Sequence, residues 1–227
     1  MALPCPGPTP GTPVGDGREG IVLLSVTGVS GAGKSASLAA LSRALADEPV
    51  SCVEFDSVGV PADADTAWRH RVVEHWVQHA LAEQEQQRHL ILGGQVAMGE
   101  LLAAPSADKL DGIAAYVLDC SPDVRRTRIL ARGDSPERLD DHIAFGEWFR
   151  RHSADPTHMP HVIRVTSPVD MRWERWEDWT ADDPRWTFDV IDTDDLSREQ
   201  AAERVEAWAR EVLAGRRPVL RAGWAQR

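Results

Sequence analysis

The segment from Ile21 to Leu45 constrains the fold more than any other part of the sequence. It opens with the apolar, β-branched run IVLLSVTG (21–28), which is typical of a strand buried on both faces. The glycine-rich stretch GVSGAGKS follows over Gly28–Ser35, and residues 35–45 have a helical pattern. A buried strand that passes through a glycine turn into a helix is the repeating unit of an α/β fold with a parallel sheet.

The stretch GVSGAGKS matches the phosphate-binding motif G-x-x-x-x-G-K-[ST] in full. Glycines allow backbone N–H groups to turn inward toward phosphate oxygens, and the N-terminus of the next helix adds partial positive charge. Lys34 is predicted to neutralise the terminal phosphates and Ser35 to coordinate Mg²⁺. The alternative is an incidental glycine turn capped by Ser35. We predict a site for ATP and Mg²⁺, contacted by Gly28, Ser30, Gly31, Ala32, Gly33, Lys34, Ser35 and Ala36.

The rest of the chain alternates predicted strands with predicted helices. The strands are expected at 52–55, 89–92, 114–118 and 187–191, and the helices at 63–87, 122–132, 135–151 and 197–214. This order predicts a doubly wound α/β domain, with a parallel sheet of about five strands and helices on both faces. We expect the domain to cover residues 20–214. Residues 1–19, rich in proline and glycine, are predicted to be a disordered tail, and residues 215–227 a loose basic tail.

Charge and composition exclude several classes of protein. The formal net charge of −11 argues against a general affinity for nucleic acid, because phosphates would be repelled. No apolar run approaches the ~18 residues of a membrane span, and the N-terminus lacks a leader pattern, so a cytoplasmic protein without membrane contacts is expected. Cys5, Cys52 and Cys120 predict neither a disulfide framework nor a zinc site. We expect a monomer or a homodimer.

Residues 21–213 resemble the small P-loop kinases of metabolites and nucleotides, a group that includes shikimate, gluconate and adenylate kinases. Beyond the phosphate loop, the resemblance rests on three features: EFDS at the end of the second strand, Gly93-Gly94-Gln95 after the third, and DCSPDVRRTRILARGD after the fourth. The last is similar to the start of the lid in these kinases. The resemblance implies transfer of the γ-phosphate of ATP to a hydroxyl of a small-molecule acceptor, with a helical lid over about 122–152.

Two groups of residues are candidates for the acceptor side. Asp56 ends the second strand, where ligands bind in open α/β sheets, and could take the acceptor's proton or share Mg²⁺ through water. Its alternative role is that of a turn or helix-capping residue. Gly93 and Gly94 permit a close approach of backbone to substrate, or simply make a tight turn. The resemblance to shikimate kinases adds Gln95 to this substrate loop.

Three arginines, Arg125, Arg128 and Arg132, are spaced to lie on one helical face. Such a face is stabilised when anionic groups meet it, and phosphoryl transfer requires positive charge over the γ-phosphate. The resemblance implies that Arg128 lies near the adenine and that Arg132, before Gly133, acts at the lid hinge. A solvated face paired with nearby acids is the alternative. Arg126 is predicted to point away.

Other assignments stay open. No acid follows the third strand in the usual Mg²⁺-holding place, so Asp119 and Asp192 are candidates for that role. Residues 164–186 form a tryptophan-rich insert, whose Trp173, Trp176 and Trp179 could line a planar substrate but are better explained by helix packing. Two other functions compete with a metabolite kinase: a nucleoside monophosphate kinase, and a nucleotide-gated switch. A switch would not need a carboxylate at position 56.

Overall fold

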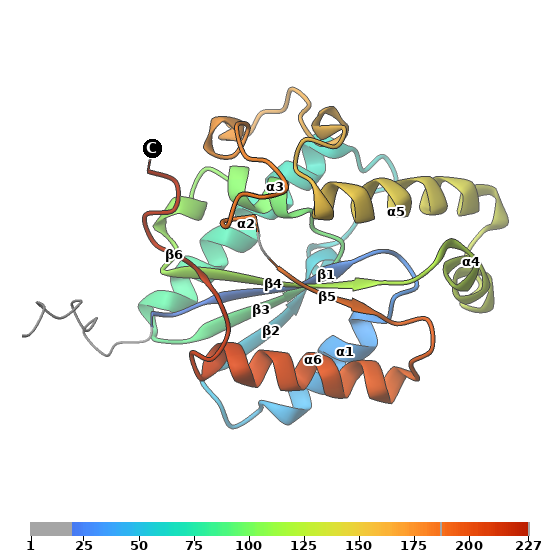
Figure 1. Cartoon of the computed structure of the whole chain (residues 1–227), viewed down its shortest axis with the longest axis horizontal. Helices are drawn as coiled ribbons and strands as arrows, with labels where there is room; N and C mark the ends of the chain where they lie inside the picture. Colours follow the sequence, from blue (N-terminus) through green and yellow to red (C-terminus); the bar gives the residue numbers. More distant parts are fainter. Residues whose placement is uncertain (1–19, 187, 227) are drawn as a thin grey trace, which may run out of the picture.

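The computed structural model describes residues 20–186 and 188–226. Five parallel strands form the centre of the molecule, in the order β2-β3-β1-β4-β5 (Figure 1). Their bounds are β1 (Leu23–Gly28), β2 (Val50–Glu54), β3 (His89–Gly93), β4 (Gly112–Asp119) and β5 (Asp189–Asp192). The predicted α/β class and parallel sheet are therefore confirmed. The expected N-terminal tail, residues 1–19, lies outside the described residues.

Helices cover both faces of the sheet (Figure 1). On one face lie α1 (Lys34–Ala44) and α6 (Arg198–Leu213), and on the other α2 (Thr66–Glu85), α3 (Met98–Ala103) and α5 (Leu139–Ala154). The helix α4 (Pro122–Ala131) lies beyond the carboxyl end of β4. Short 3-10 helices cover Phe55–Val58, Ala107–Lys109, Pro136–Arg138, Pro160–Val162 and Trp173–Arg175. All six residues of β1 are buried, as a strand with helices on both faces requires. None of the described helices is both long and apolar enough to span a bilayer.

The C-terminal segment departs from the expected loose tail. Leu220–Arg221 form β6, which pairs antiparallel with β4 through Gly112↔Arg221 and Ile113↔Leu220. Trp224 is only 6% exposed and packs edge-on against Trp179. The expectation was wrong because the composition of the segment does not reveal its strand pairing with β4 or the contact of Trp224 with Trp179, whose partners are distant in sequence.

The tryptophan-rich insert is a packing element, but not a helical one. Trp176 and Trp179 are almost fully buried, and the Trp176 indole N–H donates to Gly99 O at 2.9 Å. Arg175 donates to carbonyls at the end of α3, including Ala104 O at 2.7 Å. Trp173 lines a surface hollow of about 480 Å³, whose other lining residues are 164–171. The interpretation that Trp176 and Trp179 serve packing is thus confirmed. The helix expected for them was wrong, because the segment forms a single 3-10 turn over Trp173–Arg175.

The second half of the expected lid also belongs to the core. In α5, Trp148, Phe149 and His152 are at most 6% exposed, and the Trp148 and His152 rings stack at 4.9 Å. Helix α4 lies beyond the carboxyl end of the sheet, whereas α5 lies over one of its faces (Figure 1) and is anchored there by its apolar side chains. Any closing movement is therefore expected in the exposed turn between α4 and α5.

The buried His152 predicts a loss of stability in acid. Burial lowers its pKa from 6.5 to about 4, and its Nδ1 lies 3.1 Å from His158 O. The unfolded chain therefore takes up this proton first as the pH falls. The contribution of His152 is complete above pH 6.5 and is lost toward pH 4, by up to about 3 kcal/mol. Denaturant unfolding across this range measures the effect: His152→Gln should flatten the pH dependence of the free energy of unfolding, and an unchanged dependence would contradict the prediction.

Candidate active site

The phosphate loop is held against β4 by close backbone contacts. Gly28 has φ +137°, and a Cβ atom there would lie 1.9 Å from Leu118 O. The next residue, Val29, donates its N–H to the same carbonyl at 3.1 Å. Only glycine fits at position 28, so the end of β1 is placed directly beside the end of β4. The loop then enters α1 through Gly33, and Ser35 is exposed in the first turn.

Lys34 folds back into the loop, where its Nζ donates to Val29 O at 2.7 Å. Burial and the positive charge of Arg132 together lower the pKa of Lys34 to about 8, although the negative charge of Asp56 acts to raise it. Arg132 and Asp56 are therefore both close enough to Lys34 to act on its charge, although the three residues come from α1, the turn after α4 and the end of β2. A cation destabilised in this way gains from an arriving anion.

The lowered pKa of Lys34 predicts a pH limit for nucleotide binding. Because the folded-state pKa lies below the ordinary 10.5, Lys34 loses its charge from about pH 8 upward. We expect ATP affinity to be constant below pH 8 and to fall above it, with proton uptake on binding. Arg132→Gln removes the neighbouring positive charge, so the fall should begin at a higher pH. Arg126→Gln, whose exposed side chain pairs with Asp140, should leave the profile unchanged.

Calorimetric titrations with ATP on both sides of pH 8 measure this profile. An affinity that stays constant up to pH 10.5 would show that Lys34 keeps its ordinary pKa.

Asp56 is exposed at the carboxyl end of β2, within the 3-10 helix Phe55–Val58. The preceding Phe55 is 2% exposed, and its carbonyl accepts the Trp76 indole N–H at 3.0 Å. Buried Phe55 thus anchors the turn, and Asp56 is left free toward solvent on the side of Lys34. This is the location that the sequence predicted for it.

The glycines of the segment Gly93-Gly94-Gln95 are explained by packing within this chain, and not by a close approach of the backbone to substrate. A Cβ at Gly93 would lie 2.7 Å from the Leu38 side chain, and one at Gly94 would lie 2.4 Å from Phe55 Cβ. Both glycines make room for side chains of this chain. The carbonyl of Gln95 accepts a hydrogen bond from Arg69 Nη2 at 2.8 Å. The backbone here serves to pack α1 and to position Arg69.

The three arginines expected on one face of α4 reach three different partners. Arg125 is fully buried and donates to Cys120 O at 2.9 Å and to Ile143 O at 3.2 Å, so it joins α4 to α5. Arg128 donates to Thr193 O at 2.6 Å and to Gly31 O at 3.4 Å, which joins the phosphate loop to the segment after β5.

Arg132 remains exposed and pairs with Asp134 through two hydrogen bonds. Gly133, between the two, has φ +87°, so it adopts the left-handed conformation expected at a hinge. Arg126 is exposed, as predicted.

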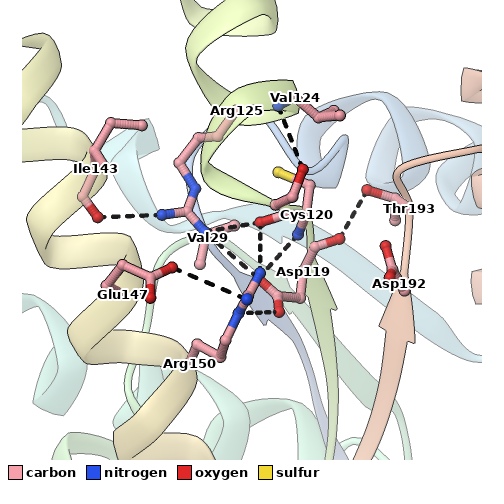
Figure 2. A network of polar contacts seen from close by, with 12 residues as sticks. Val29, Asp119, Cys120, Val124, Arg125, Ile143, Glu147, Arg150, Asp192 and Thr193 are labelled. Carbon is pink, nitrogen blue, oxygen red and sulfur yellow. Dashed lines mark hydrogen bonds and ion pairs between the residues drawn. The ribbon is translucent and has the colours of Figure 1, made fainter.

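Asp119 is occupied by arginines rather than left open for a metal (Figure 2). Its carboxylate lies 2.6 Å from Arg150 Nε and 3.5 Å from Arg125 Nη2, and it accepts the Cys120 N–H at 2.8 Å. Asp192 accepts the N–H of Asp194 at 2.9 Å and is exposed. Of the two acids left open by the sequence, Asp119 is therefore a structural residue that fastens α5 to β4.

Sequence reasoning missed a buried ion pair beside Asp56. Arg69 Nη2 lies 2.6 Å from Glu100 Oε2, and the side chains are 20% and 0% exposed. A signal was present, because Glu100 is the one acid in the apolar run QVAMGELLAAP (95–105) and a buried acid requires a partner. Nothing in the local sequence identified that partner as Arg69, 31 residues earlier.

A family profile described as an AAA domain matches residues 24–147, from β1 into α5. The chain belongs to the AAA domain family. Membership in this family of P-loop proteins implies nucleotide binding, in agreement with the geometry of the loop Gly28–Ser35. No curated protein matches the sequence.

Two solved structures share the fold of this AAA domain protein. One is a sugar kinase from Janibacter sp. HTCC2649, unliganded, with 14% sequence identity and a TM-score of 0.51, over 86% of this chain and 97% of that one. The other is the protein APE1195, with 16% identity and a TM-score of 0.50, over the same shares of the two chains. Because the sequence identities are low, this similarity establishes a shared fold. The resemblance to small P-loop kinases is confirmed as a resemblance of fold.

Proposed function

We propose that this AAA domain protein is a phosphotransferase that moves the γ-phosphate of ATP to a hydroxyl of a small molecule. The proposal assigns the triphosphate to the loop residues Gly28, Ser30, Gly31, Ala32, Gly33, Lys34, Ser35 and Ala36. Lys34 supplies positive charge to the terminal phosphates, and Arg132 supplies more when it leaves Asp134. Arg128, which already joins Gly31 to Thr193, borders the nucleotide base.

The observation that carries the proposal is the location of Asp56. Its exposed carboxylate, at the carboxyl end of β2, is close enough to raise the pKa of both Lys34 and Arg69, so it lies near the phosphate-binding lysine and near a second cation. A protein that only binds and releases nucleotide has no use for an exposed carboxylate there. A kinase needs a group at this point to accept the proton of the attacking hydroxyl.

The reaction follows from this arrangement. The acceptor oxygen attacks the γ-phosphorus while its proton passes to Asp56, and the bond to the oxygen that bridges the β- and γ-phosphorus atoms breaks. ADP leaves with that electron pair, and Asp56 returns its proton to water. The exposed Ser35 hydroxyl at the start of α1 fits a Mg²⁺ ligand. Mg²⁺, when bound there with the nucleotide, would neutralise charge on the phosphates.

Two alternatives are tested by the same experiment. A nucleoside monophosphate kinase would phosphorylate nucleotides, and a switch would bind ATP and hydrolyse it only slowly. Incubation of the protein with Mg²⁺ and ATP labelled on the γ-phosphate, together with hydroxylated metabolites or nucleoside monophosphates, distinguishes the three by the labelled product. A labelled small-molecule phosphate is the expected result. Labelled inorganic phosphate alone would contradict the proposal.

A further inference from the structure

The ion pair between Arg69 and Glu100 holds a guanidinium group in a fixed orientation beside Asp56. Arg69 donates Nε to Glu100 Oε1 at 3.0 Å, in addition to the Nη2 contacts with Glu100 and the Gln95 carbonyl. The buried Glu100 carboxylate also accepts the Ala97 N–H at 3.3 Å. Both ends of the pair are thereby tied to the backbone between β3 and α3.

Two aromatic rings complete the surroundings of Arg69. The guanidinium carbon lies 5.8 Å from the ring centre of Phe55 and 5.8 Å from that of Phe145, which belongs to α5. Phe55 is itself held by Trp76 and fits against Gly94. Within residues 20–186 and 188–226, neither N–H of Arg69 Nη1 is hydrogen-bonded. Two oriented donors are therefore available to a ligand next to Asp56.

The charge balance at this point limits which ligand fits. In the described part of the chain, the charged side chains that act on Arg69 are Glu100 and Asp56, and both raise its pKa. One guanidinium thus faces two carboxylates. Its charge is already compensated by the buried Glu100, and Asp56 adds a negative charge. At Arg69, a carboxylate or phosphate on the acceptor would be repelled by Asp56 and would meet a guanidinium whose charge is already compensated. The charges of Lys34 and Arg132 are assigned in the proposed complex to the phosphates of ATP.

We propose that the acceptor is an uncharged, hydroxyl-rich molecule, such as a sugar or polyol. One hydroxyl accepts hydrogen bonds from Arg69 Nη1, and a neighbouring hydroxyl gives its proton to Asp56 as it attacks the γ-phosphorus. The apolar face of such a ring could rest on Phe145. This inference rests on the proposed phosphotransferase function and names the substrate class of the same site.

The test uses the whole protein with Mg²⁺, ATP and matched acceptors that differ in charge. The neutral set is glucose, ribose, glycerol and myo-inositol; the anionic set is gluconate, ribose 5-phosphate and glycerol 3-phosphate. Mass spectrometry identifies phosphorylated products, and kcat/KM is compared between the sets. We expect the best neutral acceptor to exceed the best anionic one by roughly tenfold or more.

A charge-neutralising variant tests the cause of this preference. Glu100→Gln retains the shape of the side chain but removes the buried negative charge that pairs with Arg69, so the ratio of anionic to neutral kcat/KM should rise. Glu74→Gln is the matched control, because Glu74 is also a hydrogen-bonded carboxylate, but its partner is Ser106, at 2.7 Å, and not Arg69. It should leave the ratio unchanged.

Each outcome has a definite meaning. Preference for an anionic acceptor by the unmodified protein would overturn the inference and leave the phosphotransferase standing. Transfer to neither set by a protein that binds ATP would count against the proposed function, and the inference with it. If Glu100→Gln does not fold, the comparison of kcat/KM between neutral and anionic acceptors in the unmodified protein still tests the inference.

Discussion

Lys34→Ala should lower the rate of phosphoryl transfer by roughly 10²- to 10³-fold or more, the scale of one lost donor in a preorganised site. The ammonium group is the charge nearest the terminal phosphates in the proposed complex. The fold should be retained, because the one hydrogen bond lost is that to Val29 O, within the loop. Removal of a buried cation, whose charged form is disfavoured there, has little structural cost.

The chain offers a matched control for this change. The sequence contains two lysines, and Lys109 lies exposed in the 3-10 helix Ala107–Lys109. Lys109→Ala removes the same charge from the molecule without touching the loop. Melting curves, ATP titration and product formation should show a defect for Lys34→Ala only. Undiminished turnover in Lys34→Ala would remove the phosphate-loop mechanism.

Asp56→Asn should reduce the rate by roughly 10²-fold or more while ATP affinity stays the same, because a general base contributes on that scale. Asparagine retains the shape of the exposed side chain and removes its ability to take a proton. Affinity is best compared well below pH 8, where Lys34 is charged in both proteins. Single-turnover measurements at saturating ATP then report the chemical step alone.

Glu54→Gln is the control for Asp56→Asn. Glu54 is exposed at the end of β2, two residues before Asp56, and should tolerate the change with an unaltered rate. The opposite pattern at position 56, with ATP binding lost and turnover per bound complex intact, would make Asp56 a metal-holding or structural residue. The reaction would then need another base.

The features that the sequence predicted correctly are those that depend on neighbours in the chain. Strand β1, the phosphate loop and α1 form one continuous segment, so their apolar run and glycine spacing specify them locally. The location of Asp56 after β2 was predicted for a similar reason, since the end of a strand can be recognised locally. Gly133 adopts the positive φ that its place after Arg132 suggested.

The errors share a different cause. Helical spacing placed Arg125, Arg128 and Arg132 on one face, but it could not show that Arg125 would be buried against Ile143 O and Cys120 O. A Cβ at Gly146 would lie 1.9 Å from Arg125 Nη1, so the room for that arginine comes from a different helix. The tail around Trp224 was predicted to be loose because the strand that it joins lies more than a hundred residues earlier.

The sequence by itself therefore determined the α/β class, the phosphate loop and the place of Asp56 after β2, because each depends on residues adjacent in the chain. The role of Asp56 as a base stays a prediction. Only the tertiary structure decided how charges are paired: Arg69 with Glu100, and Asp119 with Arg150. The physical reason is that a charge removed from water requires a partner, and folding supplies that partner from another element. Which arginines remain free for a ligand is a property of the packed molecule.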